Sequence, residues 1–280
     1  MTLSPPQPVD VRPLLLPLHE ELMALLRGLP ASDWARPATA RWTVRDVAAH
    51  LLDTDVRRLS FHRDRHPVPP PDRAIDGYDA LAAVLHGLNA EWIAAARRLS
   101  PAVLVDLLAV AGEQSARFLS SLDPQAVALW PVAWAGESES RNWMDVGREY
   151  TERWHHQQQV REAVGAPLLV EPRWLRPALD VAAHALPRAW AATRAPVGTA
   201  VQVRVEGPSG GAWVLHVFPA GWTLLEGEDG AAAATIITDE DTAWRLWHKA
   251  LAPEEARSRV RVVGDAALAE PFFEALALMA

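Results

Sequence analysis

The chain contains no cysteine among its 280 residues. This absence excludes disulfides, cysteine-bound zinc, iron–sulfur clusters and a cysteine nucleophile. Any metal ion must therefore be held by histidine, aspartate or glutamate. Any thiol chemistry must use a thiol that belongs to another molecule.

Long runs of one charge sign are also missing, and the formal net charge is −8. Nucleic acid and anionic lipid call for clustered basic residues, so small molecules are the expected partners. No window of about 18 apolar residues lacks charge or proline, and the first residues show neither the basic nor the apolar region of a signal peptide. We therefore expect a cytoplasmic protein that does not associate with a membrane.

Half of the residues are hydrophobic, which is enough for two cores. Up to about residue 165 the apolar positions repeat at helical spacing and are interrupted by segments rich in proline, glycine or aspartate. Thr43 and Asp46 form a helix-start signal, and residues 67–71 are too rich in proline for a helix. Residues 1–167 are thus predicted to form a helical bundle, with helices near 11–29, 43–65, 77–98, 101–122 and 141–164.

After residue 167 the pattern changes, because β-branched, alternating stretches follow one another between glycine-rich turns. Residues 168–280 are predicted to form a small α+β domain with an antiparallel sheet. We expect helices near 172–192, 240–250 and 265–279, and strands at 201–206, 213–218, 222–225, 235–237 and 260–263.

A candidate metal site is formed by three residues of two predicted helices. Glu152 and His156 are four residues apart, so their side chains project from one helix face. His50 lies in the earlier helix that begins near Thr43. Two imidazoles and one carboxylate can hold a divalent ion and leave positions open for water, a thiol or a substrate.

Other interpretations of these residues stay open. His50 is also explained as a hydrogen-bonded core residue, and His156 as an ordinary helical pair with Glu152. His155 and Glu152 give the Glu-x-x-His spacing of di-iron bundles, but no second copy occurs in the chain. Two histidines and a carboxylate also describe non-haem Fe(II) oxygenases, although a helical scaffold argues against that class.

Residues near the triad have both structural and functional interpretations. Asp46 and Asp53 flank His50 and either orient its ring or serve as a helix cap and a surface charge. His62 and His66 are most simply placed at a solvated helix end. The chain has 13 tryptophans, and Trp154 is expected in the core rather than in a ligand pocket.

The sequence around the triad resembles a known family. The stretch from Trp42 through His50 to Leu51, followed by residues 148–156 and then Val160-Arg161, resembles the DinB-like superfamily and, more narrowly, the mycothiol-dependent maleylpyruvate isomerase family. The resemblance implies a four-helix bundle in which His50, Glu152 and His156 bind zinc. In the second half, residues 234–238 and 260–266 are similar to the family's C-terminal domain, which implies a fold like sterol carrier protein 2.

The resemblance also implies a function. We expect a divalent metal, zinc or alternatively nickel, and a low-molecular-weight thiol such as mycothiol as cosubstrate. A metal-bound thiol becomes a thiolate near neutral pH and attacks a small electrophile, which gives isomerisation or S-transfer. The alternative is a non-catalytic stress-response protein that binds a metal or an apolar ligand. Related bundles pair through exposed helices, so a homodimer is an open expectation.

Overall fold

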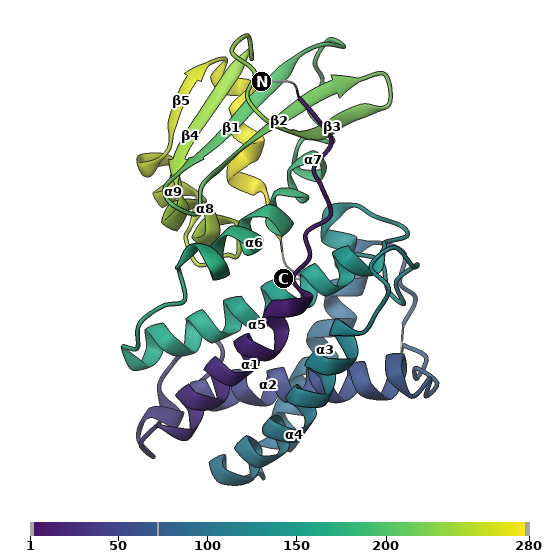
Figure 1. The fold of residues 1–280 in the computed structure, drawn as a ribbon, viewed down its shortest axis with the longest axis vertical. Coiled ribbons are helices and arrows are strands. Elements are labelled where there is room, and N and C mark those ends of the chain that lie inside the picture. The colour runs from purple at the N-terminus through teal and green to yellow at the C-terminus, as the bar shows by residue number, and fades with distance from the viewer. Residues whose placement is uncertain (1–2, 72, 278–280) are drawn as a thin grey trace. The chain divides into compact units, whose positions relative to one another are not determined.

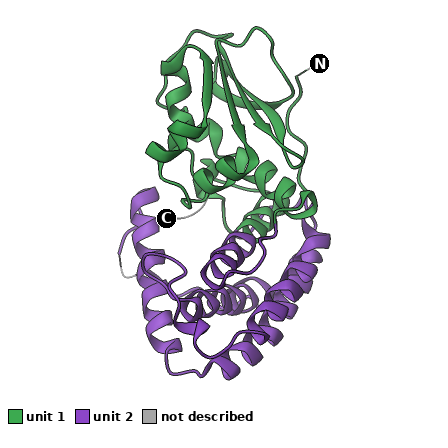
Figure 2. Cartoon of the chain, turned by 90° about the vertical axis from the view of Figure 1, so that its left-hand side faces the viewer, with its two compact units in different colours: residues 1–9, 130–151, 170–279 green, residues 10–129, 152–169, 280 purple. Residues whose placement is uncertain are grey.

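The computed structural model describes residues 3–71 and 73–277. The chain divides into two compact units (Figure 2). One unit comprises residues 1–9, 130–151 and 170–279, and the other comprises residues 10–129, 152–169 and 280. One boundary between the units falls between residues 151 and 152, within a long helix. The predicted domain boundary after residue 167 stays a prediction. In the described part of the chain, no helix is long and apolar enough to cross a membrane.

The second of these units is helical (Figure 1). Its helices are α1 (Arg12–Arg27), α2 (Val44–Arg57), α3 (Tyr78–Ala96), α4 (Pro101–Ser120) and the later part of α5 (Asn142–Val164). Helix α4 packs against α1 and α2, and α3 packs against α2. These five helices match the predicted ones. The predicted helix 43–65 changes character at Arg58, where α2 continues as a π-helix, Arg58–Arg63.

The bundle is held by an aliphatic core whose residues recur at helical spacing. On α2, Val44, Val47 and Leu51 are at most 1% exposed. Burial of each such side chain contributes on the order of 1.5–3 kcal/mol. The helix begins with the predicted capping box, in which Thr43 Oγ1 accepts from the Asp46 amide and Asp46 accepts from the Thr43 amide.

The other unit contains α6 (Pro172–Ala183), α7 (Leu186–Ala189), α8 (Glu240–Trp247), α9 (Pro253–Arg259) and α10 (Ala266–Ala269). Two predicted helices were too long. The helix expected over 172–192 is split into α6 and α7, because Pro187 has no amide hydrogen to continue the first helix. The helix expected over 265–279 gives way to a 3-10 turn at Glu270–Glu274, which contains Pro271, and its residues 278–279 lie outside the described residues.

Five strands form one sheet in the order β3-β2-β1-β4-β5. They are β1 (Ala200–Glu206), β2 (Gly211–Phe218), β3 (Gly221–Glu226), β4 (Ala234–Asp239) and β5 (Arg261–Gly264). The prediction of a purely antiparallel sheet is wrong, because β1 and β4 are parallel. Residues 227–233 make this possible by returning across the sheet. The buried Gln202 supports them, since its amide nitrogen donates to the Gly227 carbonyl and its amide oxygen accepts from the Asp229 amide.

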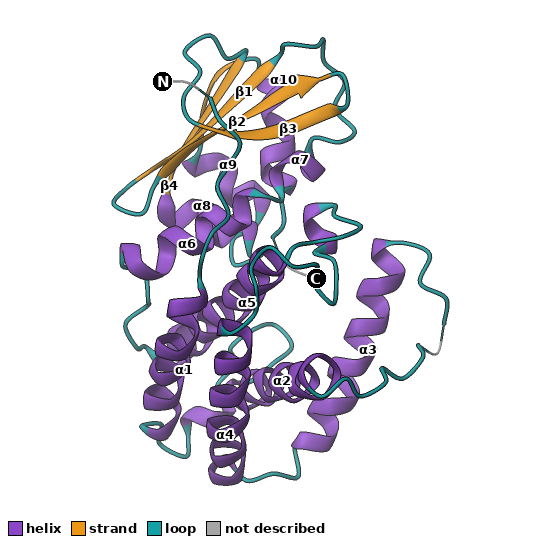
Figure 3. Cartoon of the chain, turned by 45° about the vertical axis from the view of Figure 1, so that its right-hand side comes forward, coloured by secondary structure: helices purple, strands orange, loops and turns teal. Residues whose placement is uncertain are grey.

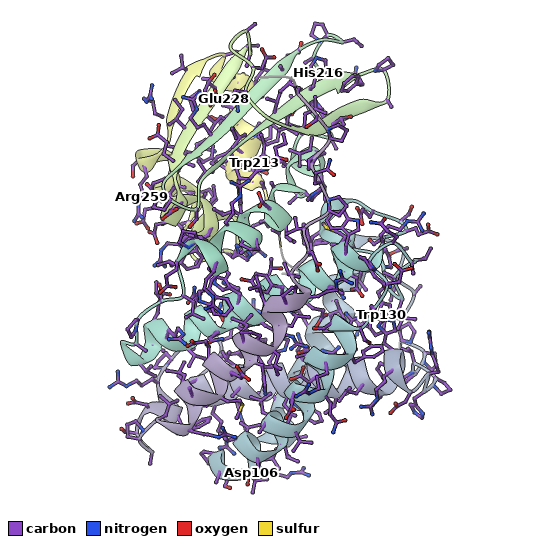
Figure 4. All side chains as sticks on the ribbon, in the orientation of Figure 1. Asp106, Trp130, Trp213, His216, Glu228 and Arg259 are labelled. Atoms are coloured by element: carbon purple, nitrogen blue, oxygen red, sulfur yellow. The ribbon has the colours of Figure 1, made fainter. Side chains whose placement is uncertain are left out.

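Helices cover one side of this sheet (Figure 3). Helix α8 packs against β1 and β4, and α6 packs against β2. Trp213 of β2, labelled in Figure 4, is 2% exposed and meets Trp247 of α8 edge to face at 6.2 Å between ring centroids. Trp247 in turn contacts Phe272. Aromatic rings therefore pack in the core of this unit beside its buried aliphatic residues.

Candidate metal centre

The first predicted ligand, His50, lies in the middle of α2 and is 7% exposed. The indole nitrogen of Trp92 on α3 donates to the Ala49 carbonyl at 2.8 Å, so the backbone next to His50 is tied to a neighbouring helix. The ring of Trp42 lies against the imidazole, with 4.9 Å between ring centroids. The position of His50 is thus fixed by its helix, by α3 and by an aromatic neighbour.

Glu152 and His156 come from one face of α5. The Glu152 Oε2 atom lies 3.2 Å from His156 Nε2, as the four-residue spacing predicts. Burial works against the charged imidazole, but the hydrogen bonds and negative charge of Glu152, together with Gln159, outweigh it and raise the pKa of His156 above its ordinary value. Glu152 therefore favours the protonated form of the His156 ring.

The structure brings all three predicted ligands together. One ligand atom from each of His50, Glu152 and His156 lies within 4.8 Å of the others. The two imidazoles meet edge to face at 4.7 Å between centroids. Two imidazole nitrogens and a carboxylate oxygen suit a borderline-soft divalent ion such as zinc or nickel, so this donor set fits the implied metal.

One wall of this site comes from a residue to which the sequence assigned no role. Trp42 lies 5.9 Å from His156 as well as close to His50, measured between ring centroids. Its backbone amide donates to Thr39 Oγ1 at 3.0 Å, so the loop before α2 holds the indole in place. The Glu152 side chain remains 25% exposed. The site is thus shielded by an indole at the histidines and accessible at the carboxylate.

The two helices that carry the ligands are also joined by a buried ion pair. Arg153 of α5 lies 2.7 Å from Asp55 of α2 and donates to Ser115 of α4 at 3.0 Å. The arginine and aspartate side chains are 10% and 2% exposed. Sequence reasoning missed this pair because its members are 98 residues apart. Each residue also has polar or charged neighbours in the sequence, so its own position gives no signal of a buried charge.

The carboxylates on either side of His50 have structural partners. Asp46 serves the helix cap and also accepts from Arg97 at 3.3 Å, which supports its interpretation as a capping residue. Asp53 is paired with Arg57 at 2.7 Å. It is only 6% exposed, so the expectation of a surface charge was wrong. Burial, partly offset by Arg57, raises the pKa of Asp53.

Two further expectations have clear outcomes. The expectation of a solvated helix end is wrong for His62, which is 5% exposed, lies 3.3 Å from Arg58 Nη1 and meets the Phe118 ring edge to face. His66 is exposed, as expected. Trp154 is fully buried, and its indole nitrogen donates to the Leu169 carbonyl. The prediction of a core tryptophan is therefore confirmed.

A second polar cluster lies in the interior of the bundle. His19, Asp55, Arg153 and Gln157 line a small cavity together with aliphatic residues and Gly112. Arg153 and Gln157 each follow a predicted ligand by one position, so they point about 100° around α5 from the triad. Burial, with the positive charge of Arg153, lowers the pKa of His19 to about 4. His19 is therefore neutral at pH 7.

These features define a class of protein, a helical bundle with a candidate His-Glu-His metal centre on two of its helices. Residues 15–161 match the N-terminal domain of the mycothiol maleylpyruvate isomerase family. This match covers more than half of the chain, so the chain belongs to that family. No curated protein matches the sequence.

Solved structures with a similar fold carry the same family name. A crystal structure of the mycothiol-dependent maleylpyruvate isomerase is similar with a TM-score of 0.50 and 15% sequence identity. A histidine-to-alanine mutant of that enzyme gives a TM-score of 0.52 at the same identity. Each comparison covers 93% of this chain and 95% of the other. At this identity the similarity establishes the fold.

Proposed function

We propose that this protein is a metal-dependent enzyme that uses a low-molecular-weight thiol, mycothiol or a similar molecule, to act on a small electrophile. The observation that carries the proposal is the convergence of His50, Glu152 and His156 within 4.8 Å on two helices of the bundle. Membership of a family named for a mycothiol-dependent isomerase supports the choice of thiol and reaction class.

His50, Glu152 and His156 would hold the divalent ion, with zinc the best fit to the donor set and nickel the alternative. A bound divalent ion favours the anionic form of a thiol, and so supplies a thiolate near neutral pH. The chain's ligands carry one negative charge between them, which leaves the site positive and attractive to a thiolate. Trp42 shields the histidine side, so we expect the thiol to approach beside the partly exposed Glu152.

Isomerisation of an activated double bond is the first reaction class to test, and S-transfer is the second. The chain has no cysteine, so the external thiol must be the sulfur nucleophile. We extend the proposal to a domain boundary after residue 167, a C-terminal domain like sterol carrier protein 2, a cytoplasmic location and pairing of two copies.

The first experiment measures metal content by inductively coupled plasma mass spectrometry. Wild-type protein is compared with His156→Ala and with the exposed control His66→Ala, and circular dichroism verifies folding of each. We expect about one zinc or nickel per chain in wild type and control, because a three-ligand site holds one ion, and loss of that ion in the folded His156→Ala variant.

The second experiment tests catalysis with the metal-loaded protein. Activated alkenes and other electrophiles are incubated with mycothiol, with another thiol and without thiol. Turnover that requires both thiol and His156 is the expected result. A wild-type protein that neither contains nor takes up metal would refute the proposal and favour the non-catalytic alternative.

A further inference from the structure

A single glutamine on α5 connects the histidine ligand to its neighbouring histidine. The Gln159 amide oxygen lies 2.8 Å from His156 Nδ1, and the amide nitrogen lies 2.8 Å from His155 Nε2. Gln159 is half-buried, and His155 is 3% exposed. The spacing places the amide one helical turn beyond both rings, at three residues from one and four from the other.

In the hydrogen bonds that join His155, Gln159 and His156, the ligand role of His156 determines which atom donates and which accepts. Its Nε2 atom faces Glu152, and a metal ligand must present a lone pair there. The hydrogen of the neutral ring is then on Nδ1, where it donates to the Gln159 oxygen. Metal-binding histidines commonly donate their second ring N–H in this way, which fixes the tautomer and the ring orientation.

The ligand role of His156 also determines which way the glutamine amide points. If the amide were rotated by half a turn, its N–H groups would face the Nδ1–H of His156, and that contact would be repulsive. With the amide oxygen at His156, the amide nitrogen faces His155 Nε2 and donates to it. His155 therefore accepts the hydrogen bond that this orientation offers.

We propose that Gln159 is a positioning residue for the metal centre, and that His155 accepts from the other end of its amide. Gln159 keeps His156 in the tautomer whose Nε2 lone pair points to the ion. This inference rests on the metal site of the proposed function. It assigns a role to His155, which the sequence suggested only as a di-iron ligand.

The experiment compares three variants by their affinity for zinc, measured by competition with a chromogenic chelator. Gln159→Leu keeps the size of the side chain but removes the acceptor. Gln159→Glu keeps an oxygen that accepts from His156 Nδ1. Gln158→Leu is the matched control, because the neighbouring Gln158 is fully buried and its amide bonds only to the backbone of Leu169.

We expect Gln159→Leu to weaken zinc binding by about 10- to 100-fold, the usual cost of losing an outer hydrogen-bond partner. Gln159→Glu should stay within about threefold of wild type, because one carboxylate oxygen accepts the same hydrogen bond from His156 and His155 can donate to the other from its Nε2–H tautomer. Gln158→Leu should lower the melting temperature of the metal-free protein without changing zinc affinity. If Gln158→Leu fails to fold, the contrast between the two Gln159 variants still decides the question.

Nitrogen NMR of the histidine rings in the zinc-loaded protein supplies a readout that packing alone would not change. We expect the Nδ1–H proton of His156 to exchange slowly in wild type, where it donates to Gln159, and to exchange faster in Gln159→Leu. Wild-type zinc affinity in Gln159→Leu would overturn the inference while the metal site stands. So would equal losses of affinity in Gln159→Leu and Gln159→Glu. A wild type that binds no zinc would overturn the metal site and this inference with it.

Discussion

Acidification should destabilise the helical unit through His19. The folded protein lowers the pKa of this histidine from 6.5 to about 4, because the ring is buried and faces the charge of Arg153. Between these values the unfolded chain binds a proton that the folded chain excludes. The stabilising contribution is therefore complete above the unfolded pKa and is lost as the pH falls toward 4.

The size of the effect follows from the shift. A difference between 6.5 and about 4 corresponds to a total of about 3 kcal/mol, since each pKa unit is worth about 1.4 kcal/mol. By pH 5 about 2 kcal/mol of it should already be lost. His19→Gln removes the titrating ring while keeping an N–H donor, so this variant should lose less stability than wild type over the same interval.

The assay is urea unfolding followed by circular dichroism at about pH 7 and about pH 5, with a chelator present so that metal binding does not contribute. The exposed His66→Gln serves as the control and should follow wild type. The quantity compared is the difference in unfolding free energy between variant and wild type at each pH. Equal pH dependence in His19→Gln and wild type would refute the reasoning.

Two further predictions concern packing in the bundle. Gly112→Ala should destabilise the protein by about 1–2 kcal/mol, because the new Cβ atom would lie 2.2 Å from His19 Cε1. Gly87→Ala is the control and should stabilise the helix by up to about 1 kcal/mol, because nothing lies within 4 Å of its new Cβ atom. Thermal unfolding checks both variants, and a stabilising Gly112→Ala would contradict the argument. Asp55→Ala should destabilise by about 3–5 kcal/mol because it leaves the Arg153 charge buried, and the double replacement Asp55→Leu with Arg153→Met should cost less in the same urea assay. A double variant that is less stable than Asp55→Ala would argue against an uncompensated charge as the cause.

Local sequence signals predicted the parts of the fold that depend on neighbouring residues. Helix α2 begins where Thr43 and Asp46 form their capping box, and α4 begins at Pro101, the first residue of the helix predicted near 101–122. The order of the strands could not be predicted from such local signals, because the pairing of β1 with β4 depends on how residues 227–233 return across the sheet. Alternation of residue types within a strand carries no information about its neighbours.

The candidate site shows the same contrast. Glu152 and His156 could be paired from sequence because their spacing is that of one helical turn, and His50 was added because it lies in the predicted helix that begins near Thr43. The Arg153–Asp55 pair joins two helices, so no spacing rule reveals it. Gln159 lies three and four residues after His156 and His155, so helical spacing predicts its contacts with both rings. Glutamine is not a common metal ligand, and the residue type alone therefore gives no signal of a role.

Helix α5 changes units between Thr151 and Glu152. Its first ten residues share a unit with the sheet, where the Tyr150 hydroxyl donates to the Trp174 carbonyl and the Trp143 ring meets His184. A protein shortened to its first 167 residues would keep every proposed metal ligand but lose these partners at the start of the ligand-bearing helix. The two halves of this chain are therefore not interchangeable modules, and a recombination that exchanged the C-terminal half would have to preserve the contacts of α5.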